Sequence, residues 1–228
     1  MPWTELATAT LAGTDLRLYG AEEGAYMIRA NGLELMSSRN HGSEDVLGRM
    51  AGALARECGK PEPRILVGGL GLGYTLAAAV GELQGAGHIT VAEISPDVIA
   101  WYERHFEPAL FAERPRNLRI ASSDVASLLR DAARARYDVI VLDVDNGPRA
   151  LAADGNDYLY GAEGLAALHA ALAENGIALV WSGFEAPEFA SRAATEGFAV
   201  ARETVGIAER PGLSHYIYRL TRIYAGSS

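Results

Sequence analysis

The stretch Arg64–Gly73, RILVGGLGLG, decides the fold of this chain. It begins as an uninterrupted apolar run and ends in closely spaced glycines, which is typical of a buried parallel strand that turns sharply at its carboxyl end. A helix is expected next, over residues 74–83. A strand, a glycine-rich turn and a helix in this order form the repeating unit of doubly wound α/β sheets, whose ligands bind outside the carboxyl ends of the strands.

The alternation of strand and helix continues toward the C-terminus. Further strands are expected at 88–93, 118–121, 137–143 and 176–182, and further helices at 95–106, 161–173 and 186–195. Two long alternating stretches, 198–205 and 214–223, then predict an antiparallel hairpin. Such an ending favours a Rossmann-like class I methyltransferase fold, with a mostly parallel seven-stranded sheet, over a dinucleotide-binding fold.

Residues 1–43 have a different pattern, with short alternating apolar runs interrupted by Gly-Thr-Asp, Glu-Glu-Gly and Asn-Gly. These breaks are typical of hairpin turns, so a small β-module of two to four antiparallel strands is expected ahead of an α/β domain spanning 44–228. Ser43 is expected to cap a helix that runs to about Glu57, with two acidic residues in its first turn.

The composition narrows the classes of function. The 228 residues carry a net charge of −9, which argues against a nucleic-acid-binding protein. Cys58 is the only cysteine and the five histidines lack ligand spacing, so neither a disulfide nor a metal site is expected. The chain shows no basic, apolar leader and no apolar run of about 20 residues, so a cytoplasmic protein without membrane contact is expected.

The glycine-rich turn is the candidate cofactor site. Glycines let a ligand approach the backbone closely, and the following helix offers free N–H donors. Glu93, at the end of the second strand, is placed to accept the two ribose hydroxyls of a nucleoside. Asp124, at the end of the third, is placed to accept from the adenine amino group, with Val125 against the ring. The expected cofactor-binding residues are Gly68, Gly69, Gly71, Gly73, Glu93, Ile94, Asp124, Val125 and Asp143.

The candidate catalytic residues follow the fourth strand, in the stretch LDVDNGP. Asp143 ends the strand, and a carboxylate there can bind a cationic amine, take its proton or stabilise a sulfonium. Asp145 is a second candidate, although Asp-Asn-Gly is also good turn chemistry. The long segment 149–160 is a candidate lid. The expected substrate contacts are Glu44, Asp45, Asn156, Asp157, Tyr160 and Trp181.

The chain resembles the spermidine synthase family and its short bacterial relatives. The stretches that carry the resemblance are NGLELMSSRNHGSEDVL, ILVGGLGLGYTLAAAV, ITVAEISPDVIAWYERHF, YDVIVLDVDNGP and LYGAEGLAALHAALAENGIALVWS. The resemblance implies transfer of an aminopropyl group from decarboxylated S-adenosylmethionine to an amine. Glu93 would then hold the ribose, Asp124 would contact adenine and Asp143 would be the base. The family also implies a homodimer.

The sequence departs from that family at three places. The family carries an aspartate inside the glycine turn, where this chain has Gly71, and a second acid after the fourth strand, which is displaced here to Asp145. A Tyr-Gln pair is replaced by Glu44 and Asp45. Three functions therefore stay open: an aminopropyltransferase-like enzyme, a small-molecule methyltransferase that uses S-adenosylmethionine, and a non-catalytic nucleoside-binding protein.

Overall fold

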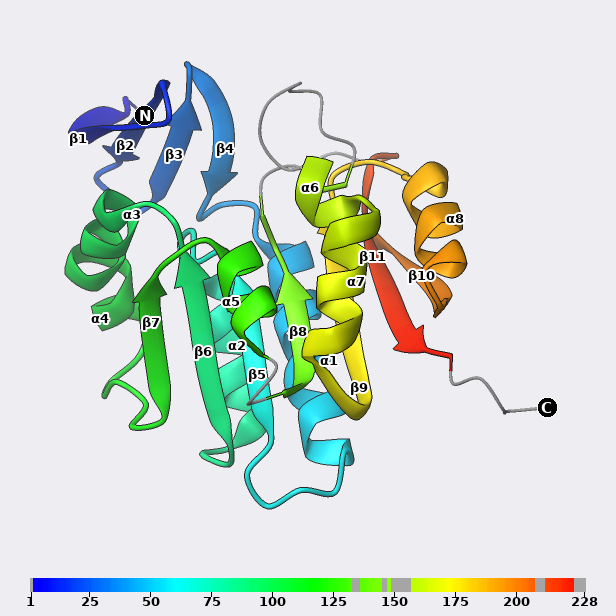
Figure 1. Ribbon diagram of the computed structural model, residues 1–228. Coiled ribbons are helices and arrows are strands. Elements are labelled where there is room, and N and C mark those ends of the chain that lie inside the picture. The colour runs from blue at the N-terminus through cyan, green and yellow to red at the C-terminus, as the bar shows by residue number, and fades with distance from the viewer. Residues whose placement is uncertain (1, 133–135, 145–146, 149–156, 208–211, 224–228) are drawn as a thin grey trace.

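The computed structural model describes residues 2–132, 136–144, 147–148, 157–207 and 212–223 (Figure 1). The N-terminal residues form a separate four-stranded antiparallel sheet in sequence order, as expected for the β-module. Its strands are β1 (Thr4–Leu11), β2 (Thr14–Gly20), β3 (Tyr26–Ala30) and β4 (Leu33–Ser37). The division of the chain into two domains after residue 43 stays a prediction.

The second sheet has seven strands in the order β10-β11-β9-β8-β5-β6-β7. The five strands from β9 to β7 are parallel, and β11 and β10 add an antiparallel hairpin. This confirms the predicted class I methyltransferase fold. The strands are β5 (Arg64–Gly68), β6 (His88–Glu93), β7 (Leu118–Ser122), β8 (Tyr137–Leu142), β9 (Leu172–Ser182), β10 (Phe198–Gly206) and β11 (Ser214–Arg222).

Helices cover both faces of this sheet (Figure 1). The elements are α1 (Gly42–Glu57), α2 (Tyr74–Leu83), α3 (Pro96–Trp101), the π-helical turn η1 (Tyr102–Phe106), α4 (Glu107–Leu110), α5 (Val125–Asp131), α6 (Asp157–Tyr160), α7 (Ala162–Ala171) and α8 (Pro187–Thr195). One apolar core joins α1, α2 and α3 to the sheet, and a second joins α5, α7 and α8 to the opposite face. Among the described residues, no helix is long and apolar enough to span a bilayer.

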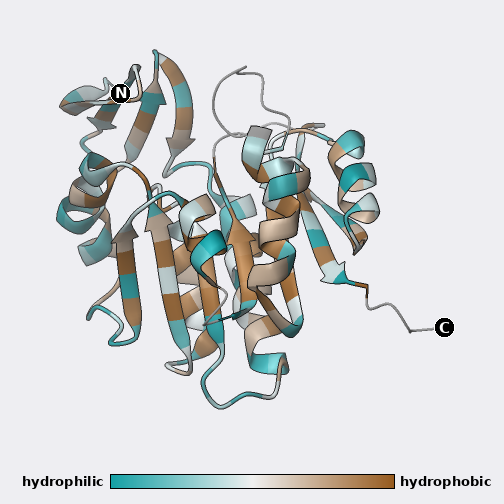
Figure 2. Ribbon diagram, in the orientation of Figure 1, coloured by the Kyte–Doolittle hydropathy of each residue, from teal (hydrophilic) through white to brown (hydrophobic). Residues whose placement is uncertain are grey.

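The central strands are mainly apolar because both of their faces are covered. In β5, Ile65 and Val67 belong to one core and Leu66 to the other, as the alternation of side chains along a strand requires. Every residue of β8 is buried, and Figure 2 shows this strand as almost continuously hydrophobic. Such runs place a strand in the middle of the sheet, so the residue that follows each of them lies at the centre of the carboxyl edge.

Several local predictions were wrong. The helix expected to begin after Ser43 begins two residues earlier, after His41, and the Ser43 hydroxyl contacts other side chains instead of capping the helix. The helix α7 ends at Ala171 and β9 begins at once, four residues before the expected strand. The helix expected to run without a break to Phe106 changes to a π-helical turn at Tyr102, and α5 was not predicted.

The turn after β5 depends on the absence of a side chain at Gly69. Its φ of +91° is unfavourable for other residues, and a Cβ atom there would lie 2.0 Å from the backbone oxygen of Asp143. Hydrogen bonds from Gly69 N to Ala92 O and from Asp143 N to Gly68 O, each 2.9 Å long, continue both parallel ladders into the turn. The ends of β5, β6 and β8 are thereby held in contact.

Replacing Gly69 by alanine is expected to lower the free energy of unfolding by more than about 2 kcal/mol, because neither the conformation nor the space permits a Cβ. Gly81→Ala is the matched control. Gly81 is helical with open space around its Cβ position, so alanine there should leave stability unchanged or raise it by up to about 1 kcal/mol. Urea unfolding measures both, and equal effects of the two substitutions would contradict the packing argument.

Candidate functional site

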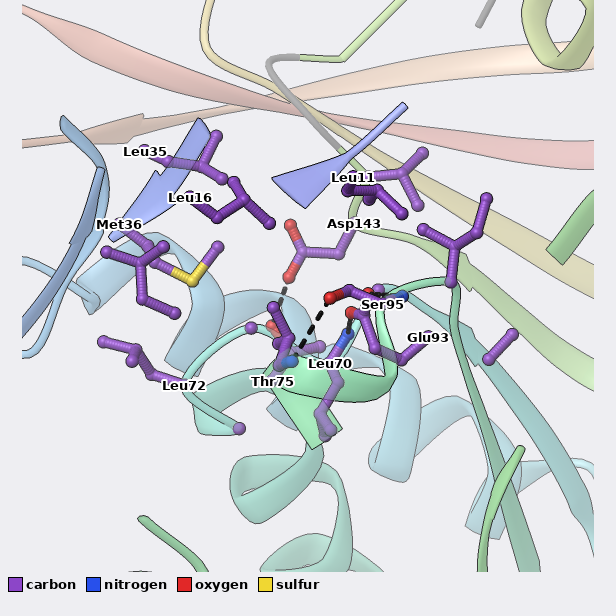
Figure 3. Close-up of a pocket in the computed structure, with 18 of the residues that line it drawn as sticks. Leu11, Leu16, Leu35, Met36, Leu70, Leu72, Thr75, Glu93, Ser95 and Asp143 are labelled. Atoms are coloured by element: carbon purple, nitrogen blue, oxygen red, sulfur yellow. Dashed lines mark hydrogen bonds between the residues drawn. The ribbon is translucent and has the colours of Figure 1, made fainter. Parts of the chain in front are cut away.

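A cavity of about 480 Å³ opens at the carboxyl ends of β5, β6 and β8, between the glycine-rich turn and the N-terminal sheet (Figure 3). The turn runs from β5 to the first residue of α2, with Gly73 in a left-handed conformation before the helix. Residues 69–75 all line the cavity, together with Glu93, Asp124 and Asp143. The structure therefore brings together at one opening the polar residues that the sequence placed at three successive strand ends.

Glu93 is held in a fixed orientation at the end of β6. One carboxyl oxygen accepts from Leu70 N at 3.1 Å and the other from Ser95 N at 2.9 Å. Burial raises the pKa of this carboxyl, while the backbone donors oppose the shift. A carboxylate has about four acceptor sites, so both oxygens keep capacity for further hydrogen bonds. A pair of neighbouring hydroxyls, as in a ribose, matches that capacity.

Asp124 and Val125 have structural roles as well as a place in the cavity. Asp124 caps α5, because its side chain accepts from Ala126 N at 2.9 Å. Val125 packs against Gly68, where an added Cβ would approach its Cγ2 to 2.8 Å. Ile94 also lines the cavity and is 55% exposed, which makes it an accessible apolar surface beside Glu93. The three residues form the side of the cavity nearest β7.

Asp143 lies at the centre of the site, directly after β8. Thr75 Oγ1, in the first turn of α2, donates to Asp143 Oδ2 at 2.7 Å. Burial, and then the nearby Glu44, raises the pKa of Asp143 to about 7, against the weaker opposing effect of the Thr75 hydrogen bond. A carboxyl with such a pKa can change protonation state near neutral pH, which suits a group that accepts a proton from an amine.

Glu44 is the second carboxyl beside Asp143, and it comes from the first turn of α1. Burial raises its pKa, while the hydrogen bond from Ser43 Oγ, 2.5 Å away, opposes the shift. Trp181, at the end of β9, lines the cavity and donates through Nε1 to the same hydroxyl at 3.1 Å. Glu44 and Trp181 thus both lie at the cavity, and their contact with a substrate stays a prediction.

The other expected substrate residues are placed differently. Asp45 is absent from the cavity lining and lies 3.0 Å from Nδ1 of His41, whose ring stacks on Tyr74. Tyr160 is also outside the lining, buried against Phe189, because α6 and α7 turn it into the second core. Asp145 and Asn156 lie outside the described residues. Asp157 begins α6, but its side chain is not among those described.

Sequence reasoning missed the wall that the N-terminal sheet contributes. Alternating residues of β2 face inward or outward, and its charged residues Asp15 and Arg17 pair with one another at 2.7 Å on the outer face. The residues that this sheet turns toward the cavity are mainly apolar, namely Leu11, Leu16, Ile28, Ala30, Leu35 and Met36. Figure 3 shows the Asp143 carboxyl group pointing into the pocket, with Leu16, Leu35 and Met36 to one side of it.

Met36 occupies the space in front of Gly71. A Cβ atom on Gly71 would lie 2.9 Å from the Met36 sulfur, and Gly71 has a φ of +52°. The position where related sequences were expected to carry an aspartate is therefore covered by a thioether side chain. Among the described residues, no group of three or more His, Cys, Asp or Glu side chains is arranged to hold a metal ion.

Comparison with solved structures places this fold among the spermidine synthases. A spermidine synthase in complex with the transition-state analogue AdoDATO superimposes with a TM-score of 0.71 at 14% identity, covering 95% of this chain and 72% of that one. The spermidine synthase from Thermotoga maritima gives the same values. A probable spermidine synthase from Corynebacterium glutamicum ATCC 13032 gives a TM-score of 0.66 at 15% identity, covering 97% and 82%. No family model and no curated protein matches the sequence.

Replacing Glu93 by alanine is expected to weaken the binding of any adenosyl ligand by about 1–3 kcal/mol, because the ligand's hydroxyls and the turn's N–H groups lose their acceptor. Calorimetry with methylthioadenosine measures the change. Asp97→Ala is the matched control, since Asp97 is an exposed acid in the first turn of α3 and does not line the cavity. Unchanged affinity in Glu93→Ala would place the ribose elsewhere.

Asp143 is expected to make stability depend on pH. Its pKa is raised from 3.8 to about 7 on folding, so between these values the folded chain holds a proton that the unfolded chain has lost. The contribution of Asp143 to the free energy of unfolding has its full value below about pH 4 and decreases as the pH rises to about 7.

The variant Asp143→Asn removes this dependence. Its free energy of unfolding relative to the wild type should rise by roughly 2–4 kcal/mol between pH 4 and pH 8, as followed by urea unfolding. A difference that is the same at both pH values would mean that folding does not raise the pKa of Asp143.

Proposed function

We propose that this chain is a spermidine-synthase-like transferase that moves an aminopropyl group from a decarboxylated S-adenosylmethionine-type sulfonium to an amine. The observation that carries the proposal is Asp143, a buried carboxyl with a pKa of about 7 at the centre of a cavity that also contains Glu93 and the glycine-rich turn. The shared fold of the spermidine synthases supports it. The amine acceptor and the sulfonium both carry positive charge, which suits an acidic site.

The residues present fit an adenosyl sulfonium. Glu93 would accept the ribose hydroxyls, and Asp124 and Val125 would hold the adenine at the side of the cavity nearest β7. Residues 69–73 line the cavity, so the chain of the ligand would lie against the backbone of this turn. Asp143 and Glu44 would then lie beside the sulfonium, where two carboxyls can stabilise a cation without a metal.

The chemistry needs a base and an aligned acceptor. An adenosyl sulfonium supplies the alkyl carbon: the amine nitrogen bonds to that carbon as the carbon–sulfur bond breaks, and the sulfur keeps the electron pair. Asp143 would accept the proton that the nitrogen loses, and the Thr75 hydroxyl keeps the carboxyl pointing into the cavity. Alignment of the two reactants in the cavity would supply much of the rate.

A second function, methyl transfer from S-adenosylmethionine to a small molecule, is favoured by one observation. Residue 71 is a glycine with Met36 packed against it, so the turn offers no acid to a free amino group of the ligand's chain. Methyl transfer requires little beyond alignment of the acceptor with the methyl carbon. A non-catalytic nucleoside-binding protein is the third reading, since a fold does not by itself fix a function.

Calorimetry with S-adenosylmethionine, its decarboxylated form and methylthioadenosine tests the proposal. Preference for the decarboxylated form, followed by amine-dependent release of methylthioadenosine, is the expected result. Preference for S-adenosylmethionine would favour methyl transfer, and release of methylthioadenosine without an amine would contradict the proposed acceptor. Binding without any turnover would favour the non-catalytic reading.

The variant Asp143→Asn tests the base in the same assay. It should bind the adenosyl ligands but lose at least about 100-fold in turnover, because general-base catalysis contributes about 10²–10⁴-fold. Asp131→Asn is the control, since Asp131 is an exposed acid at the end of α5. Full turnover by Asp143→Asn would remove Asp143 from the mechanism.

A further inference from the structure

Ser43 connects the cavity to the other end of the chain. Its side chain is buried, at 5% exposure, in the first turn of α1. Three polar atoms surround its hydroxyl: Glu44 Oε2 at 2.5 Å, His215 Nδ1 at 2.7 Å and Trp181 Nε1 at 3.1 Å. These neighbours come from α1, β11 and β9, and none of the proposed steps above uses His215.

The hydrogen-bonding capacities of these groups restrict how they can be arranged. A serine hydroxyl donates one hydrogen bond and accepts two, whereas the indole of Trp181 can only donate. Trp181 therefore takes one acceptor position of Ser43 in every state. Of the remaining two neighbours, Glu44 and His215, one accepts the hydrogen bond that the Ser43 hydroxyl donates. The other donates a hydrogen bond to the Ser43 oxygen.

Two arrangements satisfy all four groups. In the first, Glu44 is ionised and accepts a hydrogen bond from the Ser43 hydroxyl, while Nδ1–H of a positively charged His215 donates to Ser43. In the second, protonated Glu44 donates to Ser43, and Ser43 donates to unprotonated Nδ1. Passing from the first to the second breaks the Nδ1–H and Ser43 O–H bonds and forms new O–H bonds on Ser43 and Glu44, without any change in net charge.

We propose that Ser43 passes a proton between His215 and Glu44, so that His215 sets the charge of Glu44 in the cavity. His215 is then a positioning residue that acts through Ser43. The ring of His215 is only partly buried, and it packs edge-on against Trp181 with the centroids 4.8 Å apart. Glu44 lies at the cavity, so the relay joins a cavity carboxyl to a group with some access to solvent.

Other titratable groups also act on Glu44. His41 and Asp45 flank it at the start of α1, the first lowering and the second raising its pKa. Asp143 faces it from the end of β8, and the charge of Glu44 raises the pKa of Asp143. Through this effect on the pKa of Asp143, the proposal extends to catalysis. The catalytic part of the proposal rests on the proposed function. When His215 holds the proton, Glu44 is charged and Asp143 is the stronger base.

The relay itself is tested without any ligand, by NMR titration of the histidine side chains in the full chain. The Glu44 carboxylate stabilises the protonated imidazole of His215, so Glu44→Gln should lower the His215 titration midpoint by about one pH unit. Ser43→Ala should lower it too, and Ser43→Thr, which keeps a hydroxyl, should restore it. His169, which packs edge-on against Phe198 in the other core region, is an internal reference whose midpoint should not move.

An unchanged His215 midpoint in both Glu44→Gln and Ser43→Ala would overturn the relay, because a network that only holds α1 in place does not shift a titration. An equal shift of the His169 midpoint would show that the variants disturb the whole fold. The variant Ser43→Thr then decides, because a wild-type His215 midpoint in it supports the relay and a shifted His215 midpoint overturns it.

The consequence for the cavity is tested by comparing a cation with a neutral ligand. The affinity ratio of S-adenosylmethionine to methylthioadenosine should hold as pH drops through the His215 midpoint, because protonated His215 keeps Glu44 charged. In His215→Asn the ratio should fall over the same range, while His169→Asn should behave like the wild type. If neither ligand binds, the proposed function fails while the NMR result still decides the relay. If both bind with the same pH dependence in His215→Asn as in the wild type, control of the cavity by His215 is wrong.

Discussion

Backbone contact between the ends of β5 and β8 is the constraint on which the site depends. Gly69 lies so close to the carbonyl of Asp143 that no side chain fits between them. This contact brings the start of α2 beside the carboxyl end of β8, and it allows Thr75 to orient Asp143. The same glycines that permit ligand approach are thus required by packing within the protein, so their presence alone is no measure of ligand binding.

Strand periodicity made much of the site predictable. The carboxyl end of a parallel strand can be recognised in the sequence as the point where its apolar pattern stops. Glu93, Asp124 and Asp143 could therefore be assigned to one edge of the sheet from the sequence alone. Ser43 was misassigned because local capping rules do not include partners from β9 and β11. Thr75 and His215 were missed for a similar reason: each is ordinary in its own segment and acquires a role only when distant elements meet.

The N-terminal sheet and the main sheet contribute opposite properties to the cavity. The main sheet presents carboxyls, whereas the N-terminal sheet presents aliphatic side chains and turns Asp15 and Arg17 outward. An apolar wall excludes water and strengthens the electrostatic interaction between Glu44 and Asp143. The raised pKa of Asp143 therefore depends on how the two sheets pack together, a property that neither sheet has alone.

The hydrogen bond between Ser43 and His215 spans 172 positions of the chain. β11 lies inside the sheet, between β9 and β10, so the set of hydrogen-bond partners around Ser43 is complete only after this late strand has been inserted. A nascent chain that has emerged from the ribosome only as far as β9 would carry the glycine turn, Glu93 and Asp143, but it would lack His215. Formation of the complete hydrogen-bond network around Ser43 would then coincide with the final stage of cotranslational folding.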